Sequence, residues 1–319
     1  MANGTRGAGV LRSDLPDPVP VDNDSRLELL RREDTVRLPL EPVWAPEVER
    51  ELLAVVEERQ RASELLSGGV APTRSMLLVG PPGVGKTLAA RWLASKLERP
   101  LMTLDLSAVM SSFLGRTGNN IRVVLDYARR SPSVLLLDEF DAIAKRRDDA
   151  TEVGELKRLV TVLLQEVDDW PADGLLLAAT NHPELLDPAV WRRFDHVVSF
   201  PKPTPAAINE VITRLLGNSA DNRDAAGALA AALGELSHAE VVRLVNAARR
   251  QALLARQPLT AVVLERAAAL AKDGDVPKRI EIARALASLG YSQRRISELT
   301  ALSRDTIRKY GVEPVKDGD

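Results

Sequence analysis

The stretch Gly80-Pro-Pro-Gly-Val-Gly-Lys-Thr87 follows the apolar run from Ser75 to Val79 and precedes a segment of helical character that begins at Leu88. This order predicts a strand, a tight loop and a helix. Glycines let backbone N–H groups approach phosphate oxygens, and the N-terminus of the following helix adds its positive dipole end. The stretch fits the P-loop pattern at all of its specified positions and therefore predicts a fold built around a nucleotide phosphate site.

In a loop of this kind the lysine and the hydroxyl residue have separate tasks. Lys86 is expected to reach the β- and γ-phosphates, and the Thr87 hydroxyl is expected to ligate Mg²⁺. ATP and Mg²⁺ are thus the predicted cofactors. The residues predicted to line the phosphates are Gly80, Pro81, Pro82, Gly83, Val84, Gly85, Lys86, Thr87 and Leu88.

A second apolar run, Val134-Leu-Leu-Leu-Asp-Glu139, ends in two carboxylates. Ligands of an open α/β sheet bind beyond the carboxyl ends of its strands, so both acids should face the phosphate loop. Asp138 is expected to hold Mg²⁺ through its water shell. Glu139 is expected to orient and polarise a water for in-line attack on the γ-phosphate, which predicts ATP hydrolysis.

A third apolar run, Leu175-Leu-Leu-Ala-Ala-Thr-Asn181, has a polar tip, and the segment Trp191-Arg-Arg-Phe-Asp195 follows it. Asn181 is expected to position the attacking water or to contact the γ-phosphate. Arg192 and Arg193 are either a solvated pair or cations aimed at charge in the transition state, as in an arginine finger.

The wider pattern predicts an α/β fold with a five-stranded parallel sheet, because apolar runs alternate with helical segments. The expected strands are 75–79, 100–105, 133–137, 174–179 and 196–200. The expected divisions are a tail and linker over 1–43, an α/β subdomain over 44–203, an all-helical subdomain over 204–273 and a small three-helix unit over 277–312.

Composition excludes several kinds of protein. The 319 residues include no cysteine, which rules out disulfides, thiolate metal sites and cysteine nucleophiles. The three histidines are scattered without metal-ligand spacing. No run approaches the roughly 20 apolar residues of a membrane span, and the N-terminus lacks the apolar core of a signal peptide. We therefore expect no membrane partner and a cytoplasmic location.

These ordered motifs resemble the AAA+ ATPases, and within them the AAA subgroup of hexameric remodelling motors. The resemblance covers roughly residues 44–255 and includes Leu186-Asp-Pro-Ala-Val-Trp-Arg-Arg-Phe-Asp195. It implies that Asn181 is the residue called sensor 1. It also implies that Arg192 and Arg193 project into the ATP site of the neighbouring copy, so that the partner is the chain itself in a ring, a hexamer in this subgroup.

The resemblance also assigns residues outside the sheet. Ser111 to Arg122 resembles the first pore loop of protein-threading members, with Phe113, Leu114 and Gly115 facing the channel, although many members carry a basic residue where this chain has Ser112. The helical subdomain over 204–273 corresponds to the family's lid, which covers the nucleotide. His238 and Ala239 occupy the part of it whose backbone lies close to adenine in the family, and His238 replaces the usual glycine. The His238 side chain is expected either to contact base or sugar or to point to solvent.

The last unit has the pattern of a helix-turn-helix. Ser292 and Ser303 are expected N-caps, and a short turn separates the two helices that they begin. Lys278 to Lys309 contains eight basic and three acidic residues, a net +5 in a chain whose formal net charge is −2. Such a unit binds either DNA or protein. The residues expected to contact nucleic acid are Arg304, Thr306, Arg308 and Lys309.

The sequence thus predicts a ring-forming ATPase that remodels or threads a protein partner, with the last unit recruiting it to an adaptor or to DNA. One alternative is a DNA-associated switch in which ATP governs assembly. Another is a regulatory ATPase of a separate protease or nuclease, as in a defence system. The sequence does not identify the client.

Overall fold

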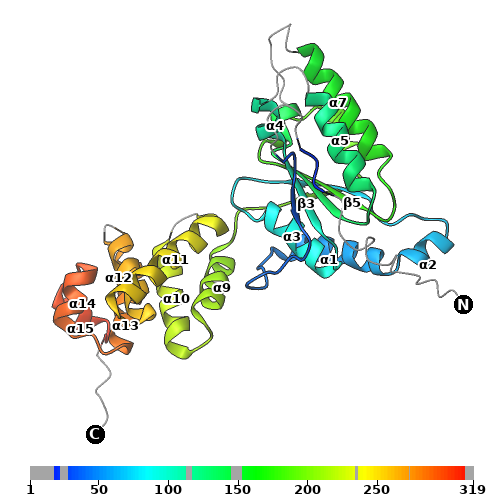
Figure 1. The fold of residues 1–319 in the computed structure, drawn as a ribbon. Helices are drawn as coiled ribbons and strands as arrows, with labels where there is room; N and C mark the ends of the chain where they lie inside the picture. Colours follow the sequence, from blue (N-terminus) through cyan, green and yellow to red (C-terminus); the bar gives the residue numbers. More distant parts are fainter. Residues whose placement is uncertain are drawn as a thin grey trace, which may run out of the picture.

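The computed structural model describes residues 18–21, 28–112, 117–144, 153–233, 236–272 and 274–312. They form an α/β part and an all-helical part that follow one another along the chain (Figure 1). The predicted α/β class and the helical region after the sheet are both confirmed.

The sheet has six strands in the order β1-β3-β4-β5-β2-β6. The five predicted strands are present and mutually parallel: β2 (Ser75–Val79), β3 (Leu101–Asp105), β4 (Val134–Asp138), β5 (Leu175–Thr180) and β6 (His196–Ser199). The sixth strand, β1 (Arg31–Glu33), was not predicted. It lies inside the segment expected to be a tail and pairs antiparallel with β3, at the edge of the sheet.

Side chains alternate between the two faces of the sheet, as strand geometry requires. Met76 and Leu78 of β2 belong to a cluster with α1 (Pro46–Gln60) and α3 (Lys86–Lys96). Leu77 and Val79 belong to a second cluster, to which α5 (Thr117–Arg129) and α7 (Val153–Asp168) contribute. Figure 1 shows α1 and α3 on one side of the sheet and α5 and α7 on the other.

Short elements complete the α/β part: α2 (Ala62–Ser67), α4 (Leu106–Ser112), α6 (Asp141–Ala144), the 3₁₀ turn η1 (Pro183–Leu185) and α8 (Pro188–Trp191). The register of the central strands aligns their carboxyl ends, since Val79 pairs with Thr180 and Asp105 with Asp138. This alignment brings the loops after β2, β4 and β5 to one edge of the sheet.

The helical part consists of α9 (Pro205–Leu216), α10 (Ala220–Ala232), α11 (His238–Ala255), α12 (Leu259–Ala271), α13 (Val276–Ser288), α14 (Gln293–Thr300) and α15 (Arg304–Lys309). These helices share one hydrophobic cluster, in which Ile212, Leu264 and Ile307 are all buried. The core is therefore continuous across the predicted boundary at 273–277, and the division into a lid and a separate unit stays a prediction of the sequence.

Within the described residues, every helix is too short or too polar to cross a membrane.

Candidate nucleotide site

The glycine-rich loop starts directly after β2, and α3 begins at Lys86. Gly83 (φ 77°) and Gly85 (φ 111°) have left-handed backbone conformations that favour glycine. A Cβ at Gly83 would lie 2.6 Å from Ser237 Oγ, and a Cβ at Gly85 would lie 2.9 Å from Trp44 Cζ3. Both positions therefore require glycine for two reasons. Their backbone conformation is left-handed, and neighbouring segments approach the backbone too closely for a Cβ.

Lys86 points back across the loop. Its Nζ donates to the Gly80 carbonyl at 2.6 Å, to the Pro81 carbonyl at 2.9 Å and to Asn181 Oδ1 at 2.7 Å. The residue is 7% exposed, and burial lowers the pKa of the ammonium to about 8. The three ammonium protons are thus matched by three oxygens, which fixes a cation at the predicted phosphate position.

Thr87 and Asp138 meet on the exposed side of the same loop. Thr87 Oγ1 donates to Asp138 Oδ2 at 3.1 Å, which joins the start of α3 to the end of β4. A hydroxyl and a carboxylate are hard oxygen ligands of the kind that Mg²⁺ prefers. The pair fits the predicted metal position, and it would hold the ion beside the phosphate loop.

Glu139 turns the chain away from the sheet. It has φ 54°, a left-handed conformation that is uncommon for a residue with a side chain, and its amide donates to Asp138 Oδ1 at 3.0 Å. Phe140 is buried next to it, and its amide donates to the Ala179 carbonyl at 2.8 Å. The Glu139 side chain itself is exposed at the edge where Lys86 and Thr87 lie.

Asp141 has a role that sequence reasoning missed. Its Oδ1 accepts from Thr180 Oγ1 at 2.8 Å and from the Asn181 amide at 3.2 Å. Asp141 therefore fixes the turn that presents Asn181 to Lys86. The available signal was a third acid after Asp138 and Glu139, facing the polar tip Thr180-Asn181 of the neighbouring strand.

The start of α11 lies against the same loop. The Ala239 amide donates to the Gly83 carbonyl at 3.2 Å. His238 Nδ1 lies 3.2 Å from the Val84 carbonyl, which only accepts, so Nδ1 carries the hydrogen. Burial lowers the pKa of His238, which favours the neutral ring. His238 Nε2 is then an acceptor, buried and without a hydrogen-bond partner within the described residues.

Trp44 covers the loop from the other side. Its ring contacts Gly85 and meets Phe200 edge-on, with centroids 6.0 Å apart. Its Nε1 is also buried and has no hydrogen-bond partner in the described part of the chain. The segment around Trp44 and the start of α11 thus flank the phosphate loop.

Comparison with known proteins agrees with this geometry. Residues 76–202 match the model of the "ATPase family associated with various cellular activities (AAA)". This part of the chain is therefore an AAA domain. The chain is 41% identical over 208 residues to the "Uncharacterized AAA family ATPase y4kL" of Sinorhizobium fredii, covering 65% of this chain and 63% of the relative.

Two further relatives have more specific names. The proteasome-activating nucleotidase of Methanocaldococcus jannaschii is 32% identical over 205 residues, covering 61% of this chain and 48% of the relative. The ATP-dependent zinc metalloprotease FtsH of Acidothermus cellulolyticus is 36% identical over 224 residues, covering 67% of this chain and 34% of the relative. The chain thus spans less than two thirds of the length of each of these relatives.

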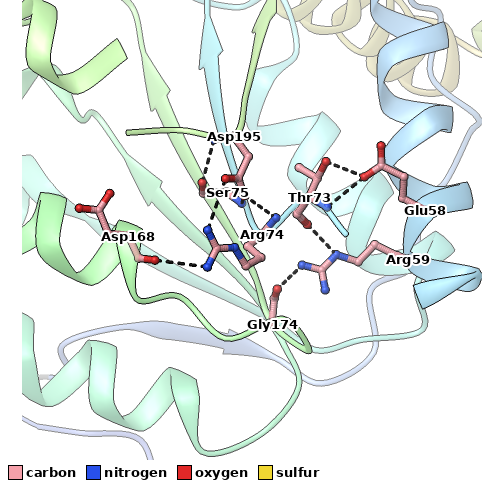
Figure 2. A network of polar contacts seen from close by, with 8 residues as sticks. All are labelled: Glu58, Arg59, Thr73, Arg74, Ser75, Asp168, Gly174 and Asp195. Carbon is pink, nitrogen blue, oxygen red and sulfur yellow. Dashed lines mark hydrogen bonds and ion pairs between the residues drawn. The ribbon is translucent and has the colours of Figure 1, made fainter. Parts of the chain in front are cut away.

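The two arginines of this AAA domain lie at the opposite edge of its sheet. Asp195, just after them, accepts from the amides of Arg74 and Ser75 at 2.8 and 3.1 Å, at the amino end of β2 (Figure 2). The phosphate loop follows the carboxyl end of β2, about 16 Å away for a five-residue strand. A single chain therefore does not bring Arg192 and Arg193 to Lys86.

The remaining predicted residues lie elsewhere in the chain. Phe113, Leu114 and Gly115 fall outside the described residues. Arg304, Arg308 and Lys309 are exposed on α15, whereas Thr306 is half-buried and its amide donates to the N-cap Ser303 Oγ at 3.1 Å. Figure 1 shows α15 at the end of the helical part that lies farthest from the sheet.

Proposed function

We propose that this chain binds ATP with Mg²⁺, hydrolyses it in a ring of identical copies, and uses the cycle to remodel a protein partner. The observation that carries the proposal is the meeting of Lys86, Asn181, Thr87 and Asp138 at one edge of the sheet. A cation, an amide, a hydroxyl and a carboxylate at the end of a glycine-rich loop suit a nucleoside triphosphate.

Each residue at this edge has a distinct task in the proposed reaction. Lys86 and the loop amides bind the β- and γ-phosphates, and Thr87 and Asp138 hold the ion. Bound Mg²⁺ supplies neutralisation of phosphate charge. Glu139, exposed beside them, orients the attacking water and accepts its proton, while Asn181, fixed by Asp141, positions the water at the γ-phosphate.

A ring follows from the position of the arginines. Because Arg192 and Arg193 lie at the edge opposite the phosphate loop, they can reach a triphosphate only in another copy. Contact between two different surfaces of identical chains is head-to-tail, and such contacts generate a ring when the rotation between copies closes. Six copies, the number implied by the resemblance, is our proposal for ring size.

The base would lie between the linker and α11, at the backbone of residues 83–85. Among the described residues, His238 Nε2 is an acceptor without a partner and Trp44 Nε1 a donor without a partner, both beside this backbone. Adenine presents a donor, its exocyclic amino group, next to an acceptor nitrogen. A modest opening of this seam on nucleotide binding would give both buried atoms a partner, and Ala239 would pack beside them.

A protein client is supported by the relatives. Two of them are named as a proteasome-activating nucleotidase and an ATP-dependent protease. In this chain Phe113, Leu114 and Gly115 are proposed to grip an extended peptide through apolar contact, which does not depend on client sequence. The exposed cations of α15 favour a second task for the helical end, which is recruitment of the chain to DNA or to an adaptor. The alternative function is a DNA-associated switch.

The test of hydrolysis and client binding uses Glu139→Gln. We expect this variant to bind ATP, to form stable rings and to retain clients in a pull-down, while its turnover falls by at least about 100-fold, the scale of a lost general base. Glu184→Gln is the matched control, because Glu184 is an exposed carboxylate at the same edge of the sheet, paired with His182. Turnover of Glu139→Gln near that of the parent would refute the assigned role.

Phe113→Ala separates a threading motor from a DNA-associated switch. For the motor we expect retained ATP hydrolysis and lost remodelling of the clients caught by Glu139→Gln. Retained remodelling, with DNA-dependent ATP turnover also unchanged, would favour the switch.

A further inference from the structure

The two adjacent arginines have different surroundings, and we infer that they have different tasks. Arg192 is the cation delivered to the triphosphate of the neighbouring copy, whereas Arg193 is a positioning residue that fixes the loop through Asp168. The inference rests on the proposed function, since it concerns hydrolysis in a pocket shared between copies.

Arg193 is engaged within its own chain. Its guanidinium forms an ion pair with the carboxylate of Asp168, the last residue of α7. Its amide donates to the Val190 carbonyl at 3.1 Å. The Asp168 carbonyl in turn accepts from the Arg74 guanidinium at 3.3 Å, as Figure 2 shows. Arg193 is therefore connected through Asp168 to the amino end of β2.

The two residues after Arg193 are held as firmly. Phe194 is buried and meets Phe140 edge-on, with ring centroids 6.0 Å apart. Asp195 accepts from the amides of Arg74 and Ser75, and its own amide donates to Ser75 Oγ at 3.1 Å. Residues 193–195 thus form an anchor whose side chains face their own chain.

Arg192 differs from this anchor. It follows the short helix α8 as its C-terminal cap, its side chain is exposed, and within the described residues it has neither a hydrogen bond nor an ion pair through its guanidinium. A guanidinium stays charged at any physiological pH and binds phosphate oxygens through a planar fork of donors. Next to Arg193, which a carboxylate already neutralises, the anchor therefore presents to solvent a cation that no described residue pairs with.

These surroundings give opposite expectations for Asp168. If Arg193 positions the loop, Asp168→Asn weakens the anchor and slows turnover. If Arg193 itself acts on the neighbour's phosphate, Asp168→Asn releases it and turnover stays the same or rises. Asp169→Asn is the matched control, because Asp169 is the next residue and its exposed side chain forms no ion pair in the described part of the chain.

The single variants are compared by kcat at saturating ATP and by ATP affinity. We expect Arg192→Ala to lose at least about 10³-fold in kcat, the range measured for such cations, with affinity retained. Arg193→Ala and Asp168→Asn should each be about two- to fivefold slower, the size that an exposed ion pair supports. Their double variant should be no slower than either, and Arg193→Lys should recover most of the rate because lysine can also pair with Asp168.

Mixed rings test the division of tasks directly. Arg192→Ala has an intact pocket but lacks the proposed cation, and Glu139→Gln offers the cation but lacks the base. Mixing the two should restore hydrolysis. The double variant Arg193→Ala, Glu139→Gln should restore it to a similar extent, whereas Arg192→Ala, Glu139→Gln should restore none.

Two results would overturn the inference while leaving the shared pocket intact. One is restoration by Glu139→Gln but not by Arg193→Ala, Glu139→Gln, and the other is turnover in Asp168→Asn that equals or exceeds that of the parent. The proposed function itself fails differently. In that case the parent chain hydrolyses ATP at the same rate per chain at every dilution, and Arg192→Ala is as active as the parent.

Discussion

Lys86 donates from Nζ to Oδ1 of Asn181 at 2.7 Å, and this bond joins the loop after β2 to the tip of β5. The other two ammonium protons go to the carbonyls of Gly80 and Pro81. When a phosphate binds here, its charged oxygens replace the neutral oxygens that now accept from the Lys86 ammonium. Charged oxygens are the stronger acceptors for an ammonium group. Nucleotide binding would therefore release the side-chain amide of Asn181 from Lys86, so that it can contact water or phosphate.

The first prediction is proton uptake when ATP binds. Burial lowers the Lys86 pKa from 10.5 to about 8 in this structure, so part of the population is neutral at pH 8.5. Phosphate favours the ammonium form and raises this pKa. Calorimetry with a non-hydrolysable ATP analogue, in buffers of different ionisation enthalpy, should show uptake of up to one proton per site at pH 8.5 and little at pH 6.5.

Lys86→Arg is the control, because arginine stays protonated at both pH values and should show no uptake from this site. The same pKa sets a stability trend. Between pH 8 and 10.5 the unfolded chain binds more protons at this residue than the folded chain, so the Lys86 contribution to the free energy of unfolding should rise with pH, by at most about 3 kcal/mol. Equal proton uptake by the parent and by Lys86→Arg at pH 8.5 would contradict the assignment of this uptake to Lys86.

The second prediction concerns the close approach of Trp44 to the loop. In Gly85→Ala the new Cβ would lie 2.9 Å from Trp44 Cζ3 at φ 111°, so either the loop or the linker must move. We expect a loss of about 1–3 kcal/mol in stability and at least tenfold weaker ATP binding. Thermal unfolding and equilibrium nucleotide titration measure the two effects.

Gly227→Ala provides the contrast. Gly227 lies within α10, and a Cβ there would meet no atom within 4 Å. Alanine is the better helix former, so this variant should be about 0.5–1 kcal/mol more stable with unchanged nucleotide affinity. Similar behaviour of the two variants would show that the loop has no special need for glycine at position 85.

The sequence predicted the parts that depend on local pattern. Five apolar runs predicted five strands, and residues 80–87 predicted the loop, because buried strands need apolar residues and the loop needs glycines. β1 escaped prediction because Arg31–Glu33 is short and polar, and only pairing with β3 makes it a strand. The bond of Asp141 to Asn181 joins residues 40 positions apart, a proximity that no local pattern specifies.

The helical part also shows that local sequence pattern does not specify contacts between distant elements. Amphipathic periodicity indicates which face of a helix is apolar, but it does not say which helix covers that face. The break at 273–277 predicts two units, and this division stays a prediction. Buried residues on both sides of the break, such as Leu264 and Leu286, belong to one cluster. The different surroundings of Arg192 and Arg193 likewise depend on Asp168, a residue distant in the chain.

The third prediction tests this shared cluster. Ile307 of α15 is 1% exposed within this cluster, so Ile307→Ala should lower the free energy of unfolding by about 2–4 kcal/mol. The whole helical part should still unfold in one transition, at a lower melting temperature. Val276→Ala, at a position that is 42% exposed, should cost less than about 1 kcal/mol. Calorimetry distinguishes the expectation from a separate early transition of the last helices, which would support an independent C-terminal unit.

The fourth prediction is electrostatic and concerns α15. Arg304, Arg308 and Lys309 are exposed, and Ser303 caps their helix. If this helix contacts DNA, replacing all three by alanine should weaken binding at low salt and make log K less steep against log salt, by about 0.9 for each lost phosphate contact. Duplex binding measured by anisotropy across a salt series gives both quantities.

The control removes the same charge from another surface. Arg243, Arg250 and Lys272 are exposed on or beside α11 and α12, and their triple alanine variant should keep the parent salt dependence. Equal loss in both variants would mean that only net charge matters. An unchanged slope in the α15 variant would show that these cations do not contact phosphates, and the helical end would then serve to bind protein.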